Sequence, residues 1–228
     1  MADCQTIDVS DIAGVGSSQL SEPLADECEA NTWGRLYPLH DAYSKVDLIE
    51  DEYTFGRDEE STVCIHEQQN GCEVPNWQAL SKVHFMIFRE QPKSGKDQDS
   101  SEDSRKYGVF LYDKSSNGTF VNGAKIGKNK TCLLKDNSEI SLSLRKNVSW
   151  VYKEKQRSSD YPDIPKEFLC RYDIGKTLGK GACGEVRICF EKETGNRSAV
   201  KLIEMKKFDK DEKIYKSAML EVNMINTP

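Results

Sequence analysis

Long apolar runs, paired cysteines and basic stripes are all missing from this 228-residue sequence. No apolar run approaches the roughly 20 residues that a membrane-spanning helix needs, so we expect no membrane association. The eight cysteines never form a Cys-x-x-Cys pair, and only three histidines could join them, which argues against a metal site. The formal net charge of −6, without a basic stripe interleaved with aromatics, argues against direct nucleic-acid binding.

The N-terminal segment lacks positive charge. Residues 1–31 carry seven Asp or Glu and no Lys or Arg, without sustained hydrophobic periodicity, which predicts a disordered acidic tail. Because this tail is no secretory signal, we expect a reducing compartment, nuclear or also cytoplasmic, in which the cysteines stay free. Ser18-Gln19 is the only Ser-Gln or Thr-Gln pair in the tail; DNA-damage kinases phosphorylate such pairs, but a Ser-rich tail also produces them by chance.

Three short polar signatures dominate the stretch from residue 53 to residue 123. They are Gly56-Arg57, Ser81-Lys82-Val83-His84 and Asn117-Gly118-Thr119. Each combines a residue that can hold an anion with one that shapes a turn: a guanidinium, a hydroxyl beside an ammonium, an amide beside a glycine. These groups suit phosphate recognition.

Runs rich in β-branched and aromatic residues separate the signatures and predict short strands. The signatures then fall at strand ends, where the loops of a β-sandwich are held rigidly at one edge. We expect a sandwich domain at 32–153, with a long loop at 68–79 and a flexible excursion at 92–105. The expected strands are 33–40, 46–49, 62–65, 84–89, 107–113, 119–122, 124–126, 139–144 and 148–153.

The order of these signatures resembles the forkhead-associated domain, a β-sandwich family whose members bind phosphothreonine peptides. The resemblance implies that phosphothreonine-containing proteins are the partners. It implies that Arg57 holds the phosphate, that Ser81 and Lys82 add a hydroxyl and a charge, and that Asn117 binds the peptide backbone. Structural support of the site is implied for Gly56, His84 and Gly118, with the histidine bracing the loop through hydrogen bonds.

Other interpretations stay open at this point. Gly-Arg and Asn-Gly are common turn dipeptides when taken singly. Ser81-x-x-His84 could belong to a hydrolase site, although no third partner has a plausible role. One departure from the family pattern is Glu59, which stands where a family member has a lysine. An acid there should repel phosphate slightly and weaken binding or change its salt dependence.

A second pattern follows a charged, proline-containing linker at 154–170. Residues 179–186 read Gly-Lys-Gly-Ala-Cys-Gly-Glu-Val. A dinucleotide site would need a helix directly after the glycines. Instead, 185–190 and 198–203 are strand-like and are joined by a turn at 193–196, which favours the glycine-loop hairpin of a protein kinase.

Resemblance to the protein-kinase N-lobe implies nucleotide binding at 171–228. In that family the glycines let the hairpin close over the ATP phosphates, and a lysine on the third strand grips them. Lys201 takes that place here, and Glu221 resembles the acid that pairs with it. ATP and Mg²⁺ are the implied cofactors of the full-length kinase. The implied ATP-binding residues are Gly179, Gly181, Gly184, Val186, Ala199 and Lys201.

The catalytic signatures of a kinase are missing from the 228 residues: there is no His-Arg-Asp loop, no Asp-Phe-Gly and no Ala-Pro-Glu. Without a catalytic base or magnesium ligand, we expect this chain to lack kinase turnover and to bind no cofactor tightly. The expected fold is mainly β, a forkhead-associated β-sandwich followed by an incomplete α+β kinase N-lobe that is too small to be stable by itself.

Together the two patterns resemble the DNA-damage checkpoint kinases that carry a forkhead-associated domain. The resemblance implies a serine/threonine kinase, of which this chain is the N-terminal portion, and a phosphorylation-dependent homodimer in which one tail docks on the second copy. The single Ser-Gln pair weakens that self-docking, because the family has a cluster. The other hypothesis is a non-catalytic phosphopeptide-binding adaptor or truncated isoform that competes with the full-length kinase, and the sequence does not choose between them.

Overall fold

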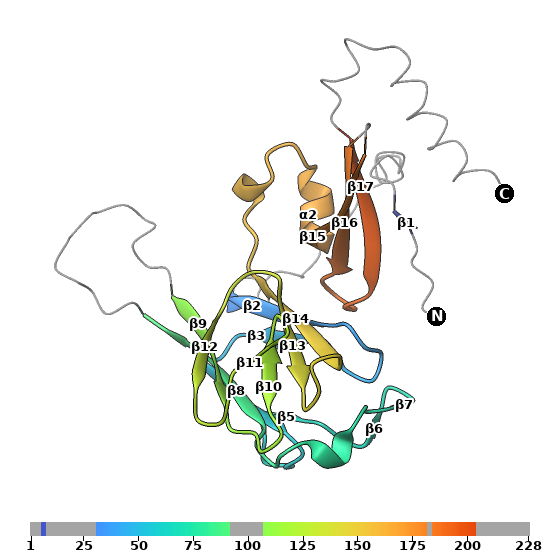
Figure 1. The fold of residues 1–228 in the computed structure, drawn as a ribbon. Helices are drawn as coiled ribbons and strands as arrows, with labels where there is room; N and C mark the ends of the chain where they lie inside the picture. Colours follow the sequence, from blue (N-terminus) through green and yellow to red (C-terminus); the bar gives the residue numbers. More distant parts are fainter. Residues whose placement is uncertain (1–5, 8–30, 92–106, 182–183, 204–228) are drawn as a thin grey trace, which may run out of the picture. The chain divides into compact units, whose positions relative to one another are not determined.

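Two compact units make up the structure, a computed structural model (Figure 1). The sandwich unit comprises Leu24–Lys155, and the hairpin unit combines Met1–Pro23 with Gln156–Pro228. No helix in the described segments is long and apolar enough to cross a bilayer. The segments that the structure describes are residues 6–7, 31–91, 107–181 and 184–203.

Two sheets form the sandwich unit, and neighbouring strands in them are antiparallel except for β4 and β5. Outside the sheets lie a ribbon of β6 (Gln68–Gln69) and β7 (Cys72–Glu73) and the 3-10 helix η2 (Trp77–Ala79). The first sheet has the order β11 (Ala124–Lys125), β10 (Thr119–Val121), β13 (Ser138–Leu142), β14 (Val148–Glu154), β2 (Gly34–Pro38) and β3 (Val46–Leu48). The second has the order β12 (Thr131–Leu134), β9 (Gly108–Asp113), β8 (Phe85–Glu90), β4 (Glu52–Gly56) and β5 (Val63–Cys64).

Aromatic and aliphatic side chains from both sheets fill the core of the sandwich unit. Phe85 and Ile87 of β8 are fully buried, whereas the residues between and after them are only half-buried, as the period of two in a strand requires. Phe55 stacks on Phe85 with ring centroids 4.4 Å apart, and Trp150 meets both rings edge-on. This aromatic cluster ties β4 and β8 of one sheet to β14 of the other.

The strand register gathers the polar signatures at one end of the sandwich unit. Phe55 pairs with Phe85, and Phe85 pairs with Asp113, at the ends of β4, β8 and β9 that adjoin the signatures. At the opposite end, Glu90 of β8 pairs with Gly108 of β9. In Figure 1, β5, β6 and β7 lie together at the lower end of the unit.

The expected β-sandwich is confirmed, and every strand expected in it coincides with an observed strand to within a few residues. Two strands were missed, β4 and β12. In β12 only Leu134 is buried, so the alternation that reveals a strand is weak there. The expected long loop at 68–79 contains the β6–β7 ribbon, because Asn70 and Gly71 both adopt positive φ and form its turn.

The hairpin unit is a small sheet with its own hydrophobic cluster, and its last three strands are antiparallel. The helix α2 (Lys166–Arg171) buries Phe168 and Leu169 in this cluster, beside Ile174 and Val200. The sequence predicted a linker at 154–170, where most of this helix lies. Its 6 residues are too few to show the spacing of apolar residues that reveals a helix. The elements are β15 (Tyr172–Gly181), β16 (Gly184–Glu191) and β17 (Arg197–Ile203), with the 3-10 helix η4 (Ser158–Asp160) and α2 before them.

One strand lies in the segment expected to be a disordered tail. β1 (Thr6–Ile7) pairs in parallel with Ala199 and Val200 of β17. An edge strand offers unpaired backbone groups to any extended segment, so these two tail residues can be ordered without a hydrophobic period of their own. Apart from Asn31, the rest of the expected tail lies outside the described residues.

Two leucines two positions apart test the core. Leu142 is fully buried, whereas Leu144 is 53% exposed. We expect Leu142→Ala to lower the free energy of unfolding by about 2 to 5 kcal/mol, since it leaves a cavity. Leu144→Ala should change it by no more than about 0.5 kcal/mol. Urea unfolding followed by tryptophan fluorescence measures both, and equal effects would contradict the packing described here.

Candidate functional site

A close backbone approach joins the first two signatures. β4 ends at Gly56, where an added Cβ would overlap the carbonyl of Lys82. Just beyond it, the backbone N–H of Arg57 donates to the carbonyl of Ser81 at 3.2 Å, and the N–H of Asp58 donates to that of Lys82 at 3.1 Å. Glycine at position 56 therefore allows the Arg57 and Ser81 segments to lie directly against each other.

Arg57 is held by an aromatic ring rather than by an acid. Its guanidinium carbon lies 5.0 Å from the centroid of the Trp77 ring, a cation–π arrangement. Its Nε is buried and has no hydrogen-bond partner in the part of the chain that the structure describes. Arg57 forms no salt bridge with any of those residues either. The Arg57 side chain is thus charged and held in place by Trp77, and its Nε has no hydrogen-bond acceptor among the described residues.

Trp77 is itself fixed through the same strand end. Its indole N–H donates to the carbonyl of Ile65 at 2.7 Å, and the N–H of Ile65 donates to the carbonyl of Gly56 at 2.7 Å. These contacts link Gly56 to Ile65, Ile65 to Trp77, and Trp77 to Arg57, which is the neighbour of Gly56 in the chain. The ring that orients the Arg57 guanidinium is therefore anchored to the residue directly before Arg57.

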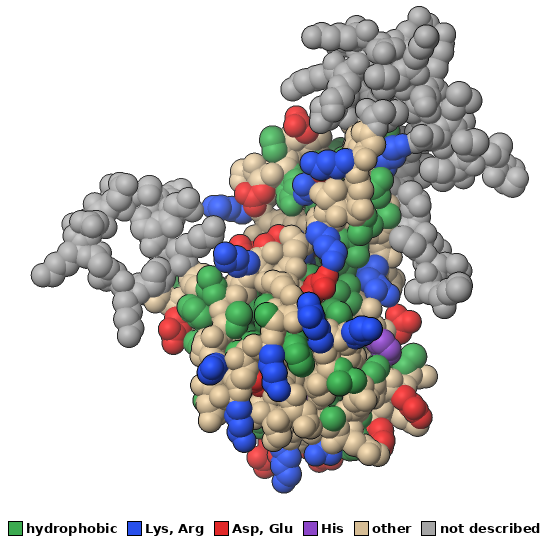
Figure 2. Space-filling model, in the orientation of Figure 1, with side chains coloured by type: hydrophobic (Ala, Val, Ile, Leu, Met, Phe, Trp, Pro, Cys, Tyr) green, Lys and Arg blue, Asp and Glu red, His purple; other side chains and the backbone are tan. Residues whose placement is uncertain are grey.

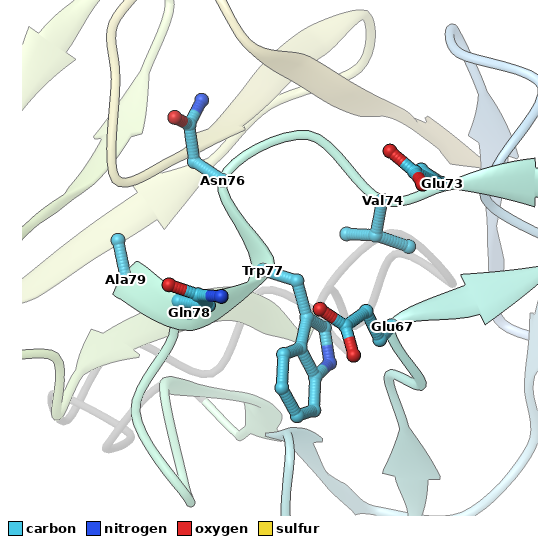
Figure 3. Close-up of a pocket in the computed structure, with 7 residues that line it drawn as sticks. All are labelled: Glu67, Glu73, Val74, Asn76, Trp77, Gln78 and Ala79. Carbon is cyan, nitrogen blue, oxygen red and sulfur yellow. The ribbon is translucent and has the colours of Figure 1, made fainter.

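A hollow of about 420 Å³ opens beside Trp77 (Figure 3). Figure 3 shows the carboxylate of Glu67 next to the indole, with Glu73 and Val74 across the hollow. Two acids at its rim make the hollow unsuited to an anion. Its remaining lining residues are Asn76, Gln78 and Ala79.

His84 braces two loops from beneath. It is fully buried; its Nδ1 accepts the N–H of Ser81 at 3.1 Å, so its Nε2 carries the proton and donates to the carbonyl of Gly118 at 3.3 Å. Burial lowers the pKa of His84, while the Gly118 carbonyl and Asp113 act more weakly in the opposite direction. Only the neutral ring can accept the N–H of Ser81, so burial favours the form of His84 that braces the two loops.

A buried carboxylate shapes the loop that carries Asn117. Asp113 accepts hydrogen bonds from the N–H and the hydroxyl of Ser115 and from the hydroxyl of Thr119. The Ser115 hydroxyl in turn accepts the N–H of Gly118 at 2.9 Å, and Gly118 has a φ of +111°, which favours glycine. The side chain of Asn117 is exposed at the top of this loop.

Ser81 and Asn117 link the loops while keeping groups available to a ligand. The Ser81 hydroxyl accepts the N–H of Ser116 at 3.0 Å, which leaves its own proton to donate. The Asn117 amide donates to the carbonyl of Ala79 at 2.8 Å, which leaves its oxygen to accept. Lys82 is exposed and has no ionic partner among the described residues. Arg57, Ser81, Lys82 and Asn117 are therefore brought to one edge of the sandwich unit.

Glu59 lies beside this edge, in the turn that follows Arg57. The turn is closed by the N–H of Ser61, which donates to the carbonyl of Asp58 at 3.0 Å. Glu59 is exposed, and its negative charge, with that of Asp58, adds to the effect of burial in raising the pKa of the Cys64 thiol. No salt bridge joins Glu59 to Arg57.

In the hairpin unit, the register places the residues of the second pattern on one face of the sheet. Gly179 pairs with Val186, and Val186 pairs with Lys201, while Ala199 lies two positions before Lys201, the spacing of a shared face. Added Cβ atoms at Gly179 and Gly181 would meet nothing within 4 Å, whereas one at Gly184 would overlap the carbonyl of Leu202.

Two further expectations concern Glu221 and metal binding. Glu221 lies outside the described residues. Within the described segments, no group of three or more His, Cys, Asp or Glu could hold a metal ion.

The sandwich unit matches a known family. The family model for the FHA domain matches residues 53–143, which include all three polar signatures. This chain contains a forkhead-associated domain. The resemblance drawn from the signatures is thereby confirmed.

Relatives of the chain are kinases that are much longer. The probable serine/threonine-protein kinase fhkE of Dictyostelium discoideum is 30% identical over 213 residues, which cover 90% of this chain and 26% of that protein. The ovarian-specific serine/threonine-protein kinase Lok of Drosophila melanogaster is 30% identical over 201 residues, which cover 80% of this chain and 38% of that protein. This chain therefore spans between about a quarter and two fifths of their length.

Solved structures include a similar domain. The N-terminal FHA domain from S. cerevisiae Rad53p, solved in complex with a phosphothreonine peptide, is 24% identical and has a TM-score of 0.38. The match covers 54% of this chain and 93% of that chain.

Three residues of the forkhead-associated domain were not singled out from the sequence: Trp77, Asp113 and Ser115. Trp77 lies in the expected long loop at 68–79. It contacts Arg57, which is 20 positions away in the sequence, and no local sequence pattern links the two residues. Asp113 and Ser115 carried a usable signal, because Asp-x-Ser before Asn-Gly is a pattern in which the carboxylate bonds backbone N–H groups two residues on.

The pH dependence of folding tests the role of His84. Because its pKa is lowered by folding, the neutral ring contributes stability above the ordinary histidine pKa of about 6.5, and this is lost as the pH falls below that value. His84→Gln keeps one acceptor and one donor but cannot titrate. We expect the free energy of unfolding to fall less between pH 7.5 and pH 5 in this variant than in the wild-type chain. His66→Gln, at an exposed position, should keep the wild-type dependence; a shallower one would point to general charge effects.

Proposed function

We propose that this chain recognises phosphothreonine peptides through Arg57, Ser81, Lys82 and Asn117. The observation that carries the proposal is the state of Arg57, a guanidinium oriented by Trp77 whose buried Nε lacks an acceptor. Arg57 is only half-buried, so part of its side chain remains open to a ligand. A phosphate oxygen there would neutralise a charge that no acid among the described residues neutralises.

Each group has a separate task in this proposal. The guanidinium of Arg57 and the ammonium of Lys82 supply the charge that separates a phosphorylated from an unphosphorylated side chain. The Ser81 hydroxyl donates its proton to a phosphate oxygen, since its bond with the N–H of Ser116 uses only a lone pair. The amide oxygen of Asn117 accepts a backbone N–H of the peptide, which orients the chain without reading its side chains. The match of residues 53–143 to the FHA domain model supports a phosphopeptide as the class of ligand.

Preorganisation explains why so few groups suffice. The close approach at Gly56, the Trp77 ring and the His84 bridge fix three of the four residues before any ligand arrives. Little side-chain entropy then remains to be lost on binding. Glu59 weakens the attraction for phosphate at long range without contacting Arg57, so its effect should depend on salt.

Titration with a phosphothreonine peptide and its unphosphorylated twin tests the proposal. We expect the wild-type chain to bind the phosphorylated form more tightly, and Arg57→Ala to weaken that binding by about 10-fold or more, since charge-assisted hydrogen bonds to a phosphate are lost. Arg89→Ala is the matched control, because Arg89 pairs with Asp51 at the other end of the sandwich unit.

Two outcomes would contradict the proposal. The first is equal affinity of the wild-type chain for the two peptides, which would mean that the signatures only form turns. The second is an equal loss of affinity in Arg57→Ala and Arg89→Ala, which would indicate damage to the fold rather than to a site. In the second case, urea unfolding of both variants shows whether their folded state has lost stability.

We also propose that the whole protein is a serine/threonine kinase of the DNA-damage checkpoint, nuclear or also cytoplasmic, that uses ATP and Mg²⁺ and forms a phosphorylation-dependent homodimer. The support is the kinase relatives and the shared face of Gly179, Val186, Ala199 and Lys201 in the hairpin unit. Gly179 and Gly181 have open space where side chains would stand, as a loop needs if it closes over phosphates by backbone approach. An incomplete kinase N-lobe is the interpretation of this unit that we favour.

The alternative is a non-catalytic adaptor or truncated isoform that competes for phosphopeptides. This role needs only the forkhead-associated domain that the chain contains. A transcript that continues into a His-Arg-Asp segment would favour the kinase, and a stop codon after Pro228 would favour the adaptor.

Calorimetry with Mg-ATP tests the nucleotide side of this proposal. We expect no measurable binding at micromolar concentrations, because the sequence lacks the segments that would supply the magnesium ligands. Lys201→Met serves as the companion variant. Micromolar affinity that disappears in Lys201→Met would show that the hairpin unit alone forms a nucleotide site and would overturn the expectation.

A further inference from the structure

A buried serine that no signature includes connects two loops of the proposed site. Ser143 directly follows the last residue of β13 and is buried. Its backbone N–H donates to the carbonyl of Gly118 at 2.9 Å, and its hydroxyl donates to the carbonyl of Ala79 at 3.2 Å. Ala79 is the last residue of η2, and Gly118 follows Asn117 in the chain. Ser143 therefore joins the loop of η2 to the loop of Asn117.

Both partners of Ser143 also determine the position of Asn117. The Ala79 carbonyl accepts the amide N–H of Asn117 at 2.8 Å, and Gly118 is the next residue of the same loop. A carbonyl oxygen has two lone pairs, so that of Ala79 can accept from Asn117 and from Ser143 at the same time. Ser143 thus holds the acceptor that fixes the Asn117 amide, and it also holds the backbone next to that residue.

The backbone of Ser143 adopts a conformation that is rare for a residue with a side chain. Its φ is +60°, and the N–H of Leu144 donates to the carbonyl of Leu142 at 2.6 Å, which closes a three-residue turn around Ser143. A buried serine at positive φ is strained, and such strain persists where the surrounding structure imposes it, often at functional sites. In this conformation both donors of Ser143 reach loops of the proposed site.

Surface charge does not provide this link between the loops. Figure 2 shows Lys and Arg side chains spread over the visible face of the sandwich unit. Ser143, in contrast, is buried, and both of its partners are backbone carbonyls. Salt screens charges but has little effect on a buried hydrogen bond between neutral groups. Loss of the Ser143 hydroxyl should therefore change peptide affinity by the same factor at low and at high salt.

We propose that Ser143 is a positioning residue for phosphopeptide recognition, which keeps the amide oxygen of Asn117 directed to the backbone of the peptide. This inference rests on the proposed function. Ser143 acts through the Ala79 carbonyl and through Gly118 and does not contact the phosphate. Without its hydroxyl, the Ala79 carbonyl is held less firmly, and the Asn117 amide can rotate away from the orientation that accepts a peptide N–H. Because every peptide has the same backbone, the effect does not depend on the side chains around the phosphothreonine.

Two variants and a matched control separate the hydroxyl from the backbone turn. Ser143→Gly removes the hydroxyl and relieves the strain, because glycine adopts positive φ readily. Ser143→Ala removes the hydroxyl and keeps the Cβ. Ser138→Ala is the control, since Ser138 is also buried, begins β13 at its opposite end, and accepts the N–H of Lys135 at 3.0 Å with its hydroxyl.

The experiment titrates each variant with a phosphothreonine peptide and its unphosphorylated twin, with and without Asn117→Ala. We expect both Ser143 variants to bind the phosphorylated peptide about 3- to 10-fold more weakly than the wild-type chain, as for one lost hydrogen bond. Ser138→Ala should bind it as the wild-type chain does. In the Asn117→Ala background, Ser143→Gly should weaken binding by less than about 2-fold, because residues that act as a unit are not additive. Urea unfolding confirms that each titrated variant is folded.

The outcomes separate this inference from the proposed function. If Asn117→Ala weakens binding of the phosphorylated peptide but Ser143→Gly does not, the positioning role is refuted and the proposed function stands. The role is also refuted if Ser143→Gly weakens binding equally with and without Asn117→Ala, because Ser143 would then not act through Asn117. If the wild-type chain does not prefer the phosphorylated peptide to its twin, the proposed function itself fails.

Discussion

The backbone of Lys82 passes so close to Gly56 that no side chain fits between them, and the rest of the site depends on this approach. It lets two backbone hydrogen bonds form beyond the end of β4, and these set Arg57 beside Ser81. The Trp77 ring that orients the guanidinium is anchored through Ile65 to the same glycine. A substitution at position 56 would therefore displace the cation, its neighbouring hydroxyl and the aromatic support together.

Buried polar groups keep the remaining loops in place. His84 connects the Ser81 segment to Gly118, and Asp113 gathers the donors of Ser115 and Thr119 beneath Asn117. Backbone groups and hydroxyls satisfy the hydrogen-bonding atoms of both His84 and Asp113. The network therefore makes the loops rigid without leaving a buried polar side chain unsatisfied. The surface can then present cations without acid partners, because the shape of the edge does not depend on ion pairs.

The sandwich and most of its strands could be predicted from alternating apolar residues and from turn residues, as β8 and β9 illustrate. The four residues of the proposed phosphate site could be singled out because their signatures are short and ordered. Trp77 could not be found in this way, since its contact with Arg57 joins two segments with no shared local pattern. The helix α2 was missed because six residues are too few for a helical period, and β1 because its order comes from the edge of β17.

The connection between β8 and β9 begins and ends at the rung of Glu90 and Gly108, several residues along both strands from Asp113 and the binding edge. Whatever joins these two strands is therefore attached at the far end of the sandwich unit. A fluorophore, an affinity tag or a surface tether introduced there would report on the domain or immobilise it while the binding edge faces the solution.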